Sequence, residues 1–87
     1  MSADHELFDA VGQRLEPRGG WHYEPSATPG APPSWCLVHQ GEVLLGVTVI
    51  DGVHSVYLPA TDTVIDFPDA SALMAWMDEH EDRYRPA

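Results

Sequence analysis

The sequence predicts a single α+β domain, residues 1–87: an N-terminal helix, an antiparallel meander of about four strands, and a C-terminal helix packed on one sheet face. Three observations support this fold class. Apolar residues recur with helical spacing near both ends, segments rich in Val, Leu and Ile fill the middle, and short turn sequences separate those segments. A chain of this length buries only roughly 60–65% of its unfolded surface, so we expect one small core.

The N-terminal helix is expected to begin after Ser2, whose hydroxyl can cap it, and to carry acidic residues in its first turn. Its apolar stripe consists of Leu7, Phe8, Val11 and Leu15. Pro17 ends the helix, because the residue before a proline avoids the α region. Residues 21–24 are a candidate for a short fifth strand. Residues 25–33 (PSATPGAPP) then form a proline-rich surface loop.

Four further segments have the composition of strands, namely residues 35–39, 43–50, 53–58 and 63–67. Asp51-Gly52 is the strongest turn signal, because a two-residue hairpin turn requires positive φ at both positions. Gln40-Gly41 is a weaker turn of the same length, and residues 59–62 make a four-residue loop.

The C-terminal helix is expected to begin after Asp69, which can cap it. Its apolar face consists of Leu73, Trp76, Met77, His80 and Tyr84. An acidic run, residues 78–82, lies near its end, with Glu79–Arg83 and Glu81–Arg85 as ion pairs one turn apart. This run is either a solvated helix end or a docking patch for a basic partner, and both interpretations stay open.

The turns also predict which residues of neighbouring strands are paired, and paired residues share a face of the sheet. The expected pairs are Ile50–Val53, Val47–Val56, Gly46–Tyr57, His39–Glu42, Leu37–Leu44, Trp35–Gly46, Leu58–Thr63, Tyr57–Val64 and Ser55–Asp66. The core face then holds Cys36, Val38, Val43, Leu45, Val47, Val49, His54, Val56, Leu58, Ile65 and Phe67. The opposite face holds Trp35, Leu37, His39, Leu44, Gly46, Thr48, Ile50, Val53, Ser55, Tyr57, Val64 and Asp66.

That opposite face is the candidate binding surface. Two helices, each ~10 Å across, fit on one side of a four-stranded sheet about 19 Å wide, which leaves the other side uncovered. Its large apolar residues together exceed what a soluble monomer usually exposes. Trp35 and Tyr57 are expected to lean over Gly46 as anchors. The predicted partner-binding residues are Trp35, Tyr57, Leu37, Leu44, Val64 and Asp66.

The charge limits the classes of partner. Fourteen acidic residues against four arginines give a formal charge of −10, and lysine is absent. Direct nucleic-acid binding requires clustered Lys and Arg, and anionic membranes repel such a chain, so we expect neither. The charge permits a basic protein partner, and it equally serves solubility. The N-terminus lacks a signal-peptide pattern and no run is apolar enough to span a membrane, so a cytoplasmic, bacterial protein is expected.

No constellation of residues predicts catalysis, a metal or a cofactor. Cys36 is a candidate nucleophile, but the strand map places His54 about 16 Å away. Ser55 is predicted to pair with Asp66, but no histidine is expected next to them on that face to act as a general base. A cross-strand hydrogen bond is therefore the simpler interpretation. The five histidines show no metal-ligand spacing. A non-enzymatic role is therefore expected.

Two functions remain. The first is a small acidic protein-interaction domain of the adaptor, inhibitor or assembly-subunit type, which uses the aromatic sheet face as a homodimer or with a protein partner. The alternative is a small-molecule-binding domain with a pocket between Trp35, Tyr57 and the proline-rich loop.

Overall fold

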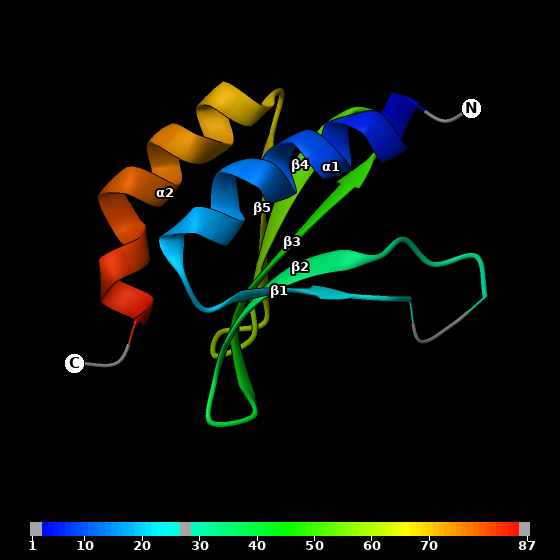
Figure 1. Cartoon of the computed structure of the whole chain (residues 1–87). Helices are drawn as coiled ribbons and strands as arrows, with labels where there is room; N and C mark the ends of the chain where they lie inside the picture. Colours follow the sequence, from blue (N-terminus) through cyan, green and yellow to red (C-terminus); the bar gives the residue numbers. More distant parts are fainter. Residues whose placement is uncertain (1–2, 27–28, 86–87) are drawn as a thin grey trace.

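The computed structural model describes residues 3–26 and 29–85 and has the predicted α+β fold (Figure 1). The elements, in chain order, are α1 (Ala3–Leu15), the 3₁₀ turn η1 (Glu16–Arg18), β1 (Trp21–Glu24), β2 (Ser34–His39), β3 (Glu42–Ile50), β4 (Val53–Leu58), β5 (Thr63–Phe67) and α2 (Ala70–Tyr84). The strands form one antiparallel sheet in sequence order, and the candidate fifth strand is β1. The expected cap Ser2 and two residues of the proline-rich loop, 27–28, lie outside the described residues.

Both helices lie on the same side of the sheet (Figure 1). α1 contacts β3, whereas α2 contacts β4 and β5. Asp69 caps α2 as expected, because its carboxylate accepts a hydrogen bond of 2.8 Å from the backbone N–H of Ala72. No helix of the described chain covers the other side of the sheet, which we call the open face.

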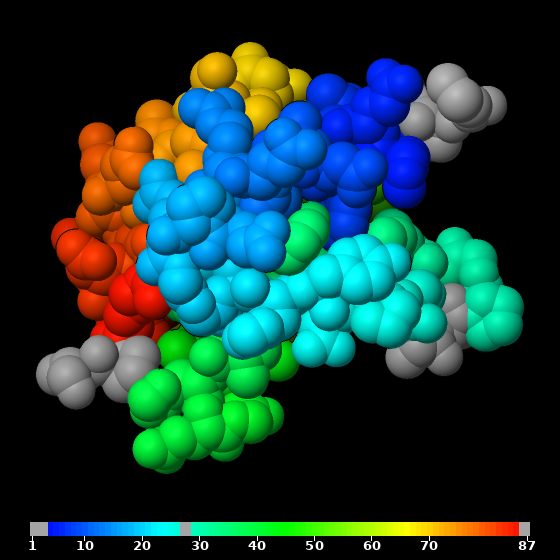
Figure 2. Space-filling view, viewed as in Figure 1, coloured from blue at the N-terminus to red at the C-terminus, as the bar shows by residue number. Residues whose placement is uncertain are grey.

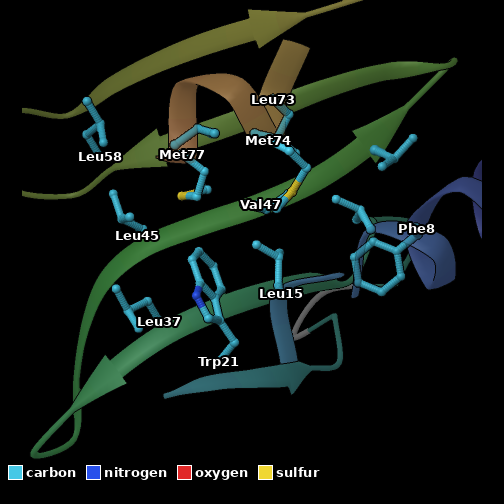
Figure 3. Close-up of a cluster of buried hydrophobic side chains, with 13 residues drawn as sticks. Phe8, Leu15, Trp21, Leu37, Leu45, Val47, Leu58, Leu73, Met74 and Met77 are labelled. Atoms are coloured by element: carbon cyan, nitrogen blue, oxygen red, sulfur yellow. The ribbon is translucent and has the colours of Figure 1, made fainter. Parts of the chain in front are cut away.

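The core fills the space between the helices and the sheet. The close-up in Figure 3 shows strand side chains such as Leu45 and Val47 facing Met74 and Met77 of α2, with Phe8 contributed by α1. The buried apolar cluster consists of Phe8, Val11, Leu15, Trp21, Leu37, Leu45, Val47, Val49, Val56, Leu58, Leu73, Met74 and Met77. All of its strand residues belong to one face of the sheet, so the hydrophobic stabilisation of the domain comes from that face.

The predicted register of β3, β4 and β5 is confirmed, including Val47–Val56, Tyr57–Val64 and Ser55–Asp66. Both two-residue turns also have the predicted backbone. Gln40 and Gly41 have φ of 51° and 79°, and Asp51 and Gly52 have φ of 52° and 79°. Hairpin turns of this kind match the twist of the strands that they join.

The predicted register between β2 and β3 is wrong beyond the turn. His39 pairs with Glu42 as expected, but a β-bulge follows, so Leu37 pairs with Leu45 and not with Leu44, and Trp35 pairs with Val47 and not with Gly46. A bulge inserts one extra residue into one strand. Because side chains alternate along a strand, this single insertion moves the rest of β2 to the opposite face.

The bulge therefore moves Trp35 and Leu37 into the core and Cys36 onto the open face, contrary to prediction. Leu37 is buried, and the indole of Trp35 stacks on Phe8 of α1 with ring centroids 5.9 Å apart. α1 thus lies across Trp35. Gly46 is flanked by Cys36 and Tyr57, so the expected pair of rings over this glycine does not form.

Candidate protein-interaction surface

The open face is defined by the alternation of side chains along the five strands. Its members are His22, Glu24, Ser34, Cys36, Val38, Val43, Gly46, Thr48, Ile50, Val53, Ser55, Tyr57, Val64 and Asp66. The β1 strand that forms one border lies at the molecular surface beside α1 (Figure 2). Cys36 and Gly46 are the buried residues among these.

Besides Val43, which pairs with Val38 next to the bulge, four apolar side chains of the open face are exposed. The exposed fractions are 48% for Ile50, 37% for Val53, 41% for Tyr57 and 60% for Val64. Ile50 and Val53 are paired in the β3–β4 hairpin beside the Asp51-Gly52 turn, and Tyr57 and Val64 are paired in the β4–β5 hairpin. We call these four residues the apolar patch. Several exposed apolar side chains on one face of a sheet are typical of interaction sites.

Tyr57 is held in place by a neighbouring loop. Its hydroxyl donates a hydrogen bond of 2.9 Å to Oδ1 of Asp62. This hydrogen bond, followed by partial burial and the negative charge of Asp62, raises the pKa of Tyr57 above its ordinary value. Opposite Tyr57 on β3, Gly46 offers no side chain, so β3 leaves this flank of the tyrosine uncovered. An oriented tyrosine with a free flank is suited to anchor a contact.

A polar row separates the two halves of the apolar patch. Ser55 donates a hydrogen bond of 2.7 Å from its hydroxyl to Oδ1 of Asp66, and Thr48 donates one of 2.9 Å to the backbone carbonyl of Pro33. His54 is buried on the opposite face and cannot serve Ser55 as a base. The Ser55–Asp66 pair is therefore a cross-strand hydrogen bond, as expected.

The structure divides the six predicted partner-binding residues. Tyr57, Val64 and Asp66 lie together on the open face. Trp35 and Leu37 are part of the core, and Leu44, the extra residue of the bulge, is half-buried against the core cluster. The predicted set of six is thus split between two faces, and a partner on the open face reaches three of them.

Cys36 has a neighbour that the predicted register missed. It pairs across the strands with His22, because β1 joins the sheet beside β2. Burial, and after it the charge of Glu24, raises the pKa of the Cys36 thiol. The thiol therefore stays protonated near neutral pH, and this cysteine–histidine pair does not make an activated nucleophile.

A pocket of about 390 Å³ lies between the first turns of α1, the end of the proline-rich loop and the end of β3. Its apolar walls come from Phe8, Pro32, Pro33 and Val49, and Asp4 lies at its border. The carboxylate of Asp4 accepts hydrogen bonds of 2.7 and 2.8 Å from the backbone N–H groups of Asp51 and Gly52. The alternative function predicted a pocket beside this loop, lined by Trp35 and Tyr57. The observed pocket is lined by Phe8 and by neither of those two residues.

The acidic run of α2 is not uniformly solvated. Glu81 is 5% exposed and accepts hydrogen bonds from the indole N–H of Trp21 at 2.8 Å, from Arg18 at 3.2 Å and from Arg85 at 3.4 Å. Arg18 also pairs with Asp78. Although burial by itself lowers the pKa of Arg18, the bonds to these two carboxylates raise it overall. We call Arg18, Trp21, Glu81 and Arg85 the Glu81 cluster.

The burial of Glu81 could have been inferred from its spacing in the sequence, although its place within an acidic run suggests an exposed residue. Leu73, Met77 and Glu81 follow one another at intervals of four residues, which is the spacing of one helix face. A carboxylate on the apolar stripe requires partners, and Arg85 stands one turn further on. The predicted Glu81–Arg85 pair is confirmed at 3.4 Å.

Within residues 3–26 and 29–85, no three His, Cys, Asp or Glu side chains gather as ligands of a metal ion would. Neither helix of the described chain is long and apolar enough to cross a membrane. No protein family model, curated protein or solved structure matches this chain. The geometry of the open face and of the pocket is therefore the basis for assigning a function.

Proposed function

We propose that this chain is a small protein-interaction domain of the adaptor, inhibitor or assembly-subunit type, and that it binds a protein through the open face of its sheet. The observation that carries the proposal is the apolar patch, Ile50, Val53, Tyr57 and Val64, on the side that no helix of the described chain covers. Burying such a patch releases water from apolar surface, which drives most protein association.

The patch has the features of a preorganised contact surface. It stands on a five-stranded sheet whose other face is packed, so its backbone is fixed before binding. Tyr57 is oriented by Asp62, and Asp66 is oriented by Ser55, so little side-chain entropy is lost when a partner docks. Tyr57 and Val64 are the proposed anchors, and Asp66 belongs to the polar margin.

The test compares two matched variants of the tagged protein in its native host. The double substitution Tyr57→Ser and Val64→Ser removes the anchors, whereas Leu7→Ser removes an exposed apolar residue on α1. We expect a protein, or a second copy of the chain, that copurifies with the wild type and with Leu7→Ser but is lost with the double variant. Circular dichroism confirms that each variant is folded. A set of copurifying proteins that is the same for all three chains would contradict the proposal.

The pocket beside the proline-rich loop supports a second candidate function, the binding of a small apolar molecule. Its volume of about 390 Å³ lies within the range of ligand sites, and Phe8, Pro32 and Val49 supply apolar walls. Ala31→Trp places a large side chain at the wall of this pocket. A fragment library screened by NMR should yield ligands that shift signals of Phe8 and Val49 and that lose binding in Ala31→Trp. Ligands that bind both chains equally would contradict this candidate.

A further inference from the structure

Charge is distributed unevenly between the two sides of the domain. The four arginines are Arg14 in α1, Arg18 in η1, Arg83 in α2 and Arg85 at its C-terminal cap. The chain has no Lys or Arg between residues 19 and 82, which include the whole sheet. Over residues 19–69 it carries six carboxylates, namely Glu24, Glu42, Asp51, Asp62, Asp66 and Asp69.

Several of these carboxylates border the apolar patch. Asp62 accepts the hydrogen bond from Tyr57, and Asp66 lies on β5 two residues after Val64. Asp51 stands in the turn that joins β3 to β4, at the other half of the patch. Glu24 belongs to the open face at β1, and its charge reaches Cys36. The exposed apolar residues of the open face are thus bordered by carboxylates on β5, in two of the connecting turns and on β1.

We infer that the occupant of the open face is a different protein, whose docking surface carries Lys or Arg beside apolar side chains. This inference rests on the proposed interaction function and names the chemistry of the partner. Rim charges of opposite sign speed association and exclude wrong partners. A second copy of this chain would instead bring its own Asp62 and Asp66 against the same carboxylates, and like charges across an interface oppose association.

Tyr57 is suited to the same partner. The carboxylate of Asp62 beside the phenol offers an ion pair to a guanidinium, and the exposed ring offers a cation–π contact to it. Asp66 presents a second carboxylate on the neighbouring strand. One carboxylate in the β4–β5 loop and a second on β5 match a partner that projects basic and apolar side chains alternately from an extended segment.

The test uses three defined ten-residue peptides, in which Val alternates with Lys, Gln or Glu, titrated into the full ¹⁵N-labelled chain. Two double variants remove the same amount of charge: Asp62→Asn with Asp66→Asn on the open face, and Glu79→Gln with Asp82→Asn on α2. The Lys peptide should shift the amide signals of Tyr57 and Val64. Its affinity should fall about tenfold in the open-face variant and less than about twofold in the α2 variant.

Four results would overturn the inference. Equal loss of affinity in the two variants would mean that total charge alone attracts the peptide. Equal binding of the Lys and Gln peptides at Tyr57 and Val64 would show that the surface binds but does not select charge, and the proposed function would stand. A dimer seen by sedimentation that Tyr57→Ser with Val64→Ser abolishes would make a second copy the occupant. If no peptide shifts Tyr57 or Val64, both the inference and the proposed surface fail.

Discussion

The indole N–H of Trp21 donates a hydrogen bond of 2.8 Å to the carboxylate of Glu81, sixty residues further along the chain. This bond joins the first strand of the sheet to the end of α2. Arg18 and Arg85 donate to the same carboxylate, so the charge of Glu81 is compensated although it is buried. Arg85 also donates to the backbone carbonyls of Arg18 and Gly19, which attaches the end of the helix to the turn before β1.

Replacing Glu81 should therefore destabilise the fold strongly. Glu81→Ala leaves the buried Trp21 indole N–H without its acceptor and leaves Arg18 with Asp78 alone, which costs about 2–4 kcal/mol of unfolding free energy. Small domains have about 5 kcal/mol in total, so a large unfolded fraction is expected in mild denaturant. Urea unfolding measures the effect, with the exposed Glu79→Ala as the control. A loss no greater than that of the control would show that the Glu81 cluster contributes nothing.

Gly12 in α1 is required by close packing. A Cβ at this position would lie 2.3 Å from the ring of Trp35. Gly→Ala in a helix interior ordinarily raises the unfolding free energy by about 1 kcal/mol. Here we expect Gly12→Ala to lower it by about 1–3 kcal/mol, because the added methyl group overpacks the core. In a Trp35→Leu background, where the large ring is absent, Gly12→Ala should instead raise the unfolding free energy. Thermal unfolding of the four chains measures this coupling, and additive effects would contradict the packing of α1 on Trp35.

His54 and the indole nitrogen of Trp35 are buried polar groups without a hydrogen-bond partner among the described residues. His54 is 1% exposed on the core face, and neither nitrogen of its ring has such a partner. An unpaired buried polar group costs about 1–3 kcal/mol, so His54→Leu should raise the unfolding free energy by about 1 kcal/mol. Chemical denaturation measures the change, and the exposed His22→Leu is the control. Destabilisation by His54→Leu would indicate that the imidazole has a partner in solution.

Tyr57 should titrate above the ordinary pKa of tyrosine because of its hydrogen bond to Asp62. The raised folded-state pKa means that the stability from this bond is fully present below the unfolded-state pKa and is lost as the pH rises through the folded-state pKa. The ultraviolet absorbance of the phenolate, recorded against pH, follows the ionisation. Asp62→Ala should lower the pKa of Tyr57 toward its ordinary value, whereas an unchanged titration would mean that the bond is absent.

Local signals predicted most of the fold. Asp51-Gly52 determined the β3–β4 register because its turn type requires positive φ, and the Asp69 cap marked the start of α2. The bulge at Leu44 had no such signal. Residues 35–38 are apolar without alternation, so a shift of one residue costs no buried polar group and the pattern cannot select the register. Trp35 was therefore assigned to the wrong face.

The residues of the candidate site could be predicted only where the pairing of their strands could be predicted. Tyr57, Val64 and Asp66 lie on strands joined by well-defined turns. The lengths of these turns determine which residues pair, and therefore that the three share a face. Trp35 and Leu37 depended on the β2 register and were misplaced with it. The pocket beside the proline-rich loop depends on how α1 approaches the end of β3, and long-range packing of this kind has no local pattern in a sequence.

The most direct test of the open face as a contact surface is site-specific photo-crosslinking in the native host. A photoreactive phenylalanine analogue at Val64 reports the apolar patch, and the same analogue at Ala75, exposed on α2, reports the helical side. We expect a discrete crosslinked species from position 64 that position 75 does not form. It should disappear when Tyr57→Ser is added. The absence of any product at position 64, or the same products from both positions, would contradict the claim that this domain binds through the open face of its sheet.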